Sequence, residues 1–367
     1  MTSEAALPTL YAPWLRTVAG GPIAAETKAT CDCCVMLPPK DNPSVAKPSD
    51  VLYFHPDTKC CAFQPDLPNF LAGRILSEMD TSMTAGRGAL EKRIARRVAV
   101  KPSRVGSGVV FGLLYRATPG VFGRAPALRC HYLSSDGNCG VWKHRPGVCA
   151  TWFCKHVRGA AGSDFWKLTD KLLRAVEWDL AYWCMAQLGV GLGELGEPTP
   201  PQPTPHVSEL QGEIDWPHYR RLWGNWAGRE VEFYQACDRL VETLTWRQVE
   251  ERCGPRVAIL AGLVRDAYKH LASPPIPERL RMANFRFVGL EANGFRVRAY
   301  SKYDPLLMPE ALVRVLRYFD GRPTDEVLET IQTEQSTVLA PSLVRRMVDF
   351  GILESCDPDP GPLRVLS

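Results

Sequence analysis

The chain has 367 residues, which at about 150 residues per domain indicates two or three domains and excludes a single small module. Of these residues 45% are hydrophobic and 23% are charged, a composition typical of globular proteins and unlike that of disordered ones. The formal net charge is +4, from 44 lysines and arginines against 40 aspartates and glutamates, so charge alone does not indicate a nucleic-acid partner.

The first fifteen residues lack a basic segment followed by an apolar one, and no later stretch reaches about 18 uncharged apolar residues. We therefore expect a soluble, cytoplasmic protein that does not enter a membrane. Residues 1–160 are rich in glycine, proline and cysteine, which predicts an irregular domain. Within it we expect one short helix through Leu71, Ile75 and Leu76, and another over Ala89–Val100.

Residues 161–275 are predicted to be a helical region. A long amphipathic helix follows Ser163, a plausible N-cap, and ends at Gly189. Residues 189–209 combine repeated glycine with the sequence PTPPQPTP, which is typical of a linker or a long surface loop. Further helices are predicted over Trp216–Leu244, Thr245–Cys253 and Arg256–Leu271.

Residues 276–367 open with two alternating segments, NFRFVGLE and FRVRAYS, joined by a turn at residues 292–294 that predicts a β-hairpin. Three helical segments follow, at residues 309–319, at 325–334 after a capping Thr324, and from Pro341 to Phe350. The predicted fold class is thus mainly α with small β: an irregular, cysteine-rich, metal-binding N-terminal domain, a helical middle and a C-terminal winged-helix-like unit.

Thirteen cysteines, an odd number without an export signal, favour thiolate chemistry over a disulfide framework. Nine of them precede residue 155 and are the predicted metal ligands: Cys31, Cys33, Cys34, Cys60, Cys61, Cys130, Cys139, Cys149 and Cys154. The remaining four are scattered and are assigned to packing: Cys184, Cys237, Cys253 and Cys356.

The most informative segment runs from Cys130 to Cys154 and carries four sulfurs in 25 residues around a turn at Asp136-Gly137-Asn138. Zinc and iron–sulfur clusters both take three or four such ligands, so the sequence leaves the choice between them open. Cys149 is predicted in the first turn of a short helix that begins at Pro146. That helix must end or bend before Cys154 if both sulfurs are to bind one centre.

Histidine could replace or support a sulfur ligand, and His131 and His144 are the better placed because each lies between predicted ligands. A surface position is the commoner role for such a histidine. Trp142, Trp152 and Phe153 are predicted to shield the centre from water.

Residues 30–160 resemble the YkgJ-type cysteine-cluster family of zinc- or iron-chelating proteins, which includes flagellin lysine N-methylases. The matching elements are Cys60-Cys61, Cys130 with Tyr132-Leu133, Gly137 with Cys139 and Val141-Trp142, and Arg145-Pro146 with Cys149. The front departs from the family pattern, because Cys31-x-Cys33-Cys34 and a gap of 25 residues replace a compact cysteine string. A purely structural zinc site fits the same residues.

Residues 279–353 resemble a PqqD-type winged helix, in which a peptide adds as an extra strand beside the hairpin. This resemblance implies a protein or peptide partner, and the lack of a dense basic recognition helix disfavours nucleic acid. Two functions follow. The first is a metal-binding protein with a peptide-binding unit, and the second is a protein or peptide lysine N-methyltransferase-like enzyme. The sequence contains no catalytic or cofactor motif that decides whether the protein is an enzyme.

Overall fold

The structure is a computed structural model that describes residues 6–38, 53–117, 120–191, 210, 212–272 and 275–356. Most of the predicted linker at 189–209 lies outside the described residues. Helices dominate and the sheets are small, as the sequence predicts. None of the described helices is both long enough and apolar enough to cross a bilayer.

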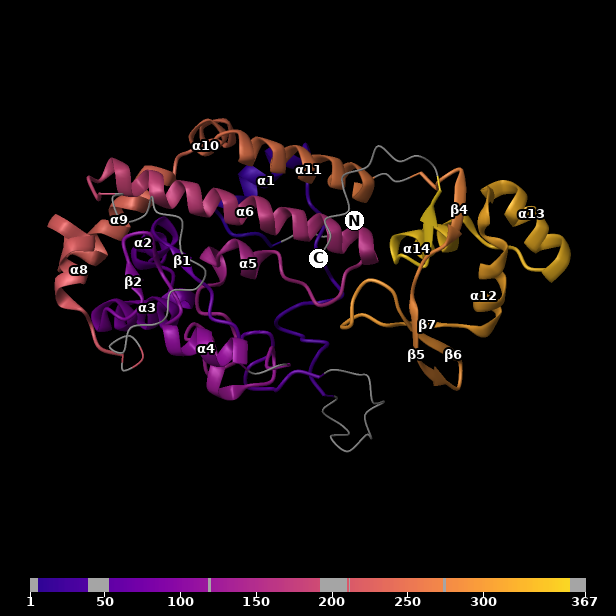
Figure 1. The fold of residues 1–367 in the computed structure, drawn as a ribbon, viewed down its shortest axis with the longest axis horizontal. Helices are drawn as coiled ribbons and strands as arrows, with labels where there is room; N and C mark the ends of the chain where they lie inside the picture. Colours follow the sequence, from indigo (N-terminus) through magenta and orange to yellow (C-terminus); the bar gives the residue numbers. More distant parts are fainter. Residues whose placement is uncertain are drawn as a thin grey trace.

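The longest helix, α6 (Gly159–Gln187), runs through the larger part of the molecule and organises its core (Figure 1). It packs against α2 (Asn69–Ser77), α9 (Glu230–Val241), α10 (Trp246–Cys253) and α11 (Pro255–Ala272), and α1 (Tyr11–Ala19) packs on α11. Buried residues from the first 160 positions and from the helical middle belong to this one core.

The contact between α2 and α9 is close because α2 carries glycine at the crossing. A Cβ at Gly73 would lie 1.8 Å from the Tyr234 carbonyl oxygen, so any larger residue would force the two helices apart. The buried Asn69 amide donates hydrogen bonds to the carbonyls of Pro102 (3.0 Å) and Ala181 (2.9 Å), which joins α2 to α6. These contacts fix α2 against α6 and α9.

The remaining elements of this larger part are short. Three strands form a sheet of order β1-β3-β2. The elements are β1 (Leu67–Pro68), α3 (Thr84–Arg96), β2 (Val100–Lys101), β3 (Arg104–Val105), α4 (Val109–Ala117), α5 (Gly147–Ala150), α8 (Trp216–Trp223) and single 3₁₀ turns at Thr81–Met83, Pro126–Leu128, Trp142–His144 and Gly224–Trp226.

The C-terminal unit lies at one end of the molecule and has its own core, which includes Leu280, Val297 and Val344 (Figure 1). It contains two three-stranded antiparallel sheets, of order β8-β4-β9 and β5-β6-β7. Its elements are β4 (Arg279–Met282), β5 (Arg286–Glu291), β6 (Gly294–Arg298), β7 (Leu306–Met308), α12 (Glu310–Val315), a 3₁₀ turn (Leu316–Tyr318), β8 (Asp320–Pro323), α13 (Thr324–Gln335), α14 (Pro341–Asp349) and β9 (Leu353–Ser355).

Four predicted helix boundaries are wrong, each for a local reason. The helix over Ala89–Val100 ends at Arg96, because Arg97 and Ala99 adopt positive φ of 56°. The stretch Trp216–Leu244 divides into α8 and α9 at Gly224, whose φ is 52°.

The other two errors concern helix starts. α6 begins at Gly159, so Ser163 is buried inside the helix and is not its N-cap. Thr324 is the first residue of α13, and its hydroxyl donates to the Pro277 carbonyl at 2.9 Å instead of capping. Both residues therefore serve tertiary packing, which a capping pattern does not reveal.

Candidate metal centre

The nine N-terminal cysteines lie in three stretches that the fold brings against one another. The backbone N–H of Cys130 donates to the Cys61 carbonyl at 2.7 Å. Lys59 Nζ donates to the carbonyls of Cys31 (2.8 Å) and Gly137 (2.9 Å). Backbone and lysine hydrogen bonds thus join the stretches around residues 31, 60 and 130–139.

The stretch from Cys130 to Cys139 is a short antiparallel turn. Leu133 and Cys139 form an isolated β-bridge, and the Gly140 N–H donates to the Tyr132 carbonyl at 2.7 Å. Gly137 at the tip has a φ of 80°, a conformation that glycine adopts without strain. Cys139 is therefore held beside Leu133, and the turn from Cys130 to Leu133 keeps Cys130 close to it in the chain.

Cys149 lies in α5, which is only one turn long and ends at Ala150. The predicted break between Cys149 and Cys154 is therefore confirmed. The helix begins at Gly147, one residue after the predicted start at Pro146.

The sulfur atoms lie close enough for their charges to interact, with Cys61 in the central position. Desolvation of the sulfur raises the pKa of five thiols, and the charge of Cys61 raises each pKa further: Cys31, Cys34, Cys130, Cys139 and Cys149. A hydrogen bond with Cys61 raises the pKa of Cys60, and burial adds to that shift. All thirteen cysteines are free thiols.

Cys154 joins the same group from its other side. Burial raises the pKa of Cys154 to about 11, and the charges of Cys34 and Cys31 add to the shift. Burial likewise raises the pKa of Cys139 to about 11 and that of Cys130 to about 12. Cys33 is exposed, as Cys31 is, and its N–H donates to the Asp32 carboxylate. The thiols whose pKa is raised are thus neutral at neutral pH unless a cation stabilises their thiolates, whereas the hydrogen bond with Cys60 lowers the pKa of Cys61.

A buried arginine lies among the thiols, and the sequence did not single it out as a charge. Arg145 is 5% exposed, and its guanidinium lies 3.7 Å from the centre of the Trp142 ring. It donates to the carbonyls of Trp142 and Ala6, each at 2.7 Å. Its Nε is buried without a partner among the described residues. The only sequence signal for Arg145 was its place directly before Pro146 in the motif that ends at Cys149.

The described residues contain no group of three or more His, Cys, Asp or Glu side chains placed to hold one metal ion. The types of donor atom suit zinc or iron, whereas the positions of the sulfurs do not form a complete ligand set. The described cysteines therefore do not form a zinc or iron–sulfur site in the observed geometry.

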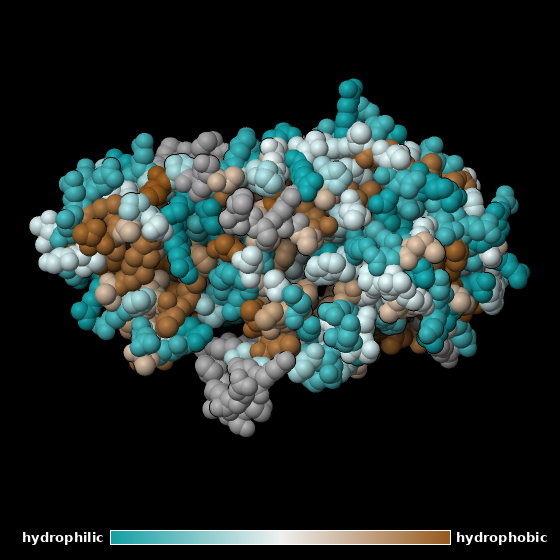
Figure 2. All heavy atoms as spheres, turned by 180° about the vertical axis from the view of Figure 1, so that it is seen from behind, coloured by the Kyte–Doolittle hydropathy of each residue, from teal (hydrophilic) through white to brown (hydrophobic). Residues whose placement is uncertain are grey.

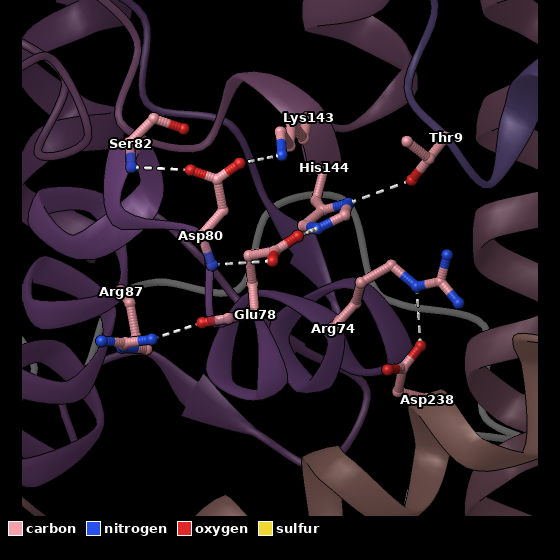
Figure 3. Close-up of polar contacts among 9 residues, drawn as sticks. All are labelled: Thr9, Arg74, Glu78, Asp80, Ser82, Arg87, Lys143, His144 and Asp238. Atoms are coloured by element: carbon pink, nitrogen blue, oxygen red, sulfur yellow. Dashed lines mark hydrogen bonds and ion pairs between the residues drawn. The ribbon is translucent and has the colours of Figure 1, made fainter.

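His144, one of the two predicted histidine alternatives, is already occupied by other contacts (Figure 3). Its Nε2 lies 2.9 Å from Glu78 Oε2 and its Nδ1 lies 3.5 Å from Thr9 Oγ1. Burial lowers the pKa of His144, partly offset by its hydrogen bond to Glu78. His131 is exposed, and its backbone N–H donates to Gln64.

The surroundings of His144 form a polar network that fixes the segment following Cys139 (Figure 3). Lys143 pairs with Asp80, which also accepts from the Ser82 N–H at 2.8 Å. Arg87 donates to the Glu78 carbonyl, and Arg74 pairs with Asp238 of α9 at 2.8 Å nearby. This network holds the backbone at Lys143 and His144 in place. Because His144 is engaged in it, the cysteine sulfurs remain the ligand candidates.

The aromatic residues beside the cysteines divide into two groups. Phe153 packs on Trp166 of α6, with ring centres 4.8 Å apart. Trp152 is 46% exposed and packs on Phe122 (5.0 Å) and on Tyr303 of the C-terminal unit (6.3 Å). Trp152 therefore links the cysteine-rich segment to the C-terminal unit.

Polar contacts strengthen the same junction. Lys28 Nζ lies 3.1 Å from the buried Asp304 carboxylate, and the His156 N–H donates to the Tyr300 hydroxyl at 3.3 Å. The loop between β6 and β7 thus lies directly against the residues that flank Cys31 and Cys154.

The four cysteines assigned to packing lie away from this group. Cys184 and Cys237 are buried in the larger core, where the Cys184 thiol donates to the Cys237 carbonyl at 3.7 Å. Cys253 lies half-buried at the end of α10, and Cys356 lies half-buried after β9.

Comparison with known proteins adds no relative: no protein-family model, no curated protein and no solved structure matches this chain.

Proposed function

We propose that this chain is a cytoplasmic metal-binding protein that holds zinc or an iron–sulfur cluster with its N-terminal cysteines and binds a peptide or protein through its C-terminal unit. The metal assignment rests on the group of eight free thiols, Cys61 among them, that lies around the buried Arg145. Free thiols in such number suit a reducing compartment.

The sulfurs that best support a first ligand set are Cys61, Cys130, Cys139 and Cys149. Each of the last three has a pKa that is raised by burial first and then by the charge of Cys61. Their segments are turns and one single-turn helix, so small backbone shifts would bring the sulfurs together. Coupling of metal binding to local rearrangement is usual, because apo proteins rarely hold a preformed site.

The first prediction concerns metal content. Cys139→Ser and Cys149→Ser should each lower the bound metal per chain, whereas Cys356→Ser should leave it unchanged because Cys356 lies in the C-terminal unit. The full chain is purified anaerobically, zinc and iron are measured, and charge-transfer absorption distinguishes an iron–sulfur cluster from zinc. Equal metal content in all three variants, or none in the native chain, would refute the ligand assignment.

The peptide-binding proposal is supported by the edge strand β5. β5 is the first strand of the sheet β5-β6-β7 and has no partner on its outer side among the described strands. A register shift between Phe287 and Gly289 brings Phe287 and Leu290 onto the same face, and these side chains are 56% and 76% exposed. Figure 2 shows hydrophobic surface over this end of the molecule. Unpaired backbone groups beside exposed apolar side chains suit strand addition.

A selection from a random peptide library on the immobilised full chain tests this proposal. Peptides should be enriched on the native chain and lost on Leu290→Asp, while Ile259→Asp should retain them. Ile259 is a matched control because it is 66% exposed on the distant helix α11. Enrichment that is equal on all three proteins would contradict the proposal.

A further inference from the structure

Two arginines of the C-terminal hairpin face each other directly, which is an unfavourable arrangement in the absence of an anion. Arg286 at the start of β5 is the in-register partner of Arg298 at the end of β6. Side chains in such cross-strand positions have Cβ atoms about 5 Å apart, and like charges there repel. Among the described residues neither guanidinium makes an ion pair or a hydrogen bond.

The neighbouring arginines of the unit are neutralised, which makes this pair distinctive. Arg281 on β4 pairs with Glu354 at 2.8 Å, and Arg296 on β6 pairs with Glu291 of β5. Within the sheet β5-β6-β7, Glu291 thus pairs with Arg296, and no carboxylate of the described residues pairs with Arg286 or Arg298.

Both arginines line one surface hollow of about 440 Å³, together with Lys302. None of the described residues that line this hollow is acidic. Asp304, which is close in sequence, is buried and is engaged by Lys28 and Tyr300. Arg286 and Arg298 thus bring positive charge to the hollow that none of its described lining residues neutralises, while the Lys302 Nζ lies 5.1 Å from the centre of the Tyr303 ring.

The hollow also has neutral donors and an apolar wall. Asn284 and Ser301 line it, and the Ser301 hydroxyl oxygen accepts from the Tyr303 N–H at 3.1 Å, which leaves the hydroxyl hydrogen able to donate outward. Phe285 and Tyr300 add aromatic rings. The volume is within the range of small-molecule sites and is much larger than a bare phosphate ion requires.

We propose that this hollow binds the phosphate group of a small organic phosphate ester, held by Arg286, Arg298 and Lys302 with its organic part against Phe285 and Tyr300. The two guanidinium groups present parallel N–H donors that match phosphate oxygens, and the dianion offsets the repulsion between them. Because the hairpin ladder holds both arginines in place, little ordering is required on binding. This inference is independent of the metal and of the peptide.

Calorimetric titration of the full chain with phenyl phosphate, inorganic phosphate and benzoate tests the site. Phenyl phosphate should bind saturably, inorganic phosphate should compete with it at lower affinity, and benzoate should bind more weakly than either. Arg286→Gln and Arg298→Gln should each weaken phenyl phosphate binding about tenfold, the effect of losing one hydrogen bond to a charged group.

Arg317→Gln is the matched control, because it removes the same charge from an exposed position within the 3₁₀ turn after α12. It should leave affinity unchanged. In phosphate-free buffer, Arg286→Gln and Arg298→Gln should unfold at or above the native temperature, which separates lost binding from lost folding. Equal affinities in the three variants, no saturation by any probe, or tighter binding of a glutamate-rich peptide than of phenyl phosphate would overturn the proposal.

Discussion

At the scale of single residues, the buried acid Glu177 of α6 is the most informative group outside the cysteine-rich segment. Its Oε1 accepts from the Tyr11 hydroxyl and from the Gly147 N–H, each at 2.6 Å, so it joins α6 to α1 and α5. Burial raises the pKa of Glu177 to about 7 from an ordinary value of 4.5. Because only Oε1 accepts these bonds, a protonated Oε2 is compatible with both.

This shift predicts a pH dependence of stability. Between about pH 4.5 and 7 the folded chain keeps a proton on Glu177 that the unfolded chain releases, so stability falls as pH rises through that window. The loss should be about 3 kcal/mol, from a shift of about 2.5 units. Glu177→Gln keeps the accepting oxygen and cannot ionise.

Urea unfolding of the native chain and of Glu177→Gln at pH 5 and pH 8 measures this effect. From pH 5 to pH 8, the unfolding free energy of Glu177→Gln should rise relative to that of the native chain by about 3 kcal/mol. If the difference in unfolding free energy between the two proteins is the same at both pH values, the fold does not raise the pKa of Glu177.

At the scale of elements, replacement by alanine should have opposite effects at two helix glycines, one at the crossing of α2 and α9 and one in α11. Gly73→Ala places a methyl group 1.8 Å from the Tyr234 carbonyl oxygen and should destabilise the fold by about 3 kcal/mol. Gly262→Ala in α11 meets no atom within 4 Å and should stabilise by about 0.5–1 kcal/mol through higher helix propensity. Thermal unfolding of both variants checks the signs, and a neutral Gly73→Ala would contradict the close crossing.

The elements also show what the sequence could predict. Helices with a clear apolar period and clear end signals were predicted, including α10 with its Thr245 cap and α14 with its leading Pro341. Helix α1 was not predicted, because no side chain caps it and Pro13 stands in its first turn. Helix α4 was not predicted either, and none of its residues is buried.

The candidate site was predictable only in part. The sequence could supply the residue types and the break after Cys149, since both follow from local spacing. The central position of Cys61, the burial of Arg145 and the occupation of His144 depend on contacts between residues about 65–140 positions apart. Such contacts leave no trace in local periodicity.

At the scale of the whole molecule, two cores meet at a charged junction. Asp349 of α14 is 5% exposed and lies between Arg158 Nε (2.5 Å) at the start of α6 and Arg345 Nε (2.8 Å) of α14. Removing one partner from a buried ionic group leaves an uncompensated charge, which is strongly unfavourable.

Asp349→Asn should therefore destabilise the C-terminal unit by about 3 kcal/mol while leaving the larger core intact. Asp320→Asn is the control, because Asp320 pairs with Arg322 at 3.0 Å with both side chains about half exposed, and should cost less than about 1 kcal/mol. Hydrogen exchange should accelerate at α14 and β4 in Asp349→Asn but not within α6. Equal protection in both variants would exclude a stabilising role for the junction.

The loop between β6 and β7 has a practical consequence for anyone who shortens this chain. A fragment that stops near residue 275 would lose Tyr303, which packs against Trp152 and Phe54, and would strip Lys28 of Asp304. The fragment that starts there would carry Asp304 without its lysine. Truncation at the predicted domain boundary near residue 275 would thus damage the surface beside Cys31 and Cys154 and the surface that packs on it. Loss of metal from such fragments would therefore not show which half supplies the ligands.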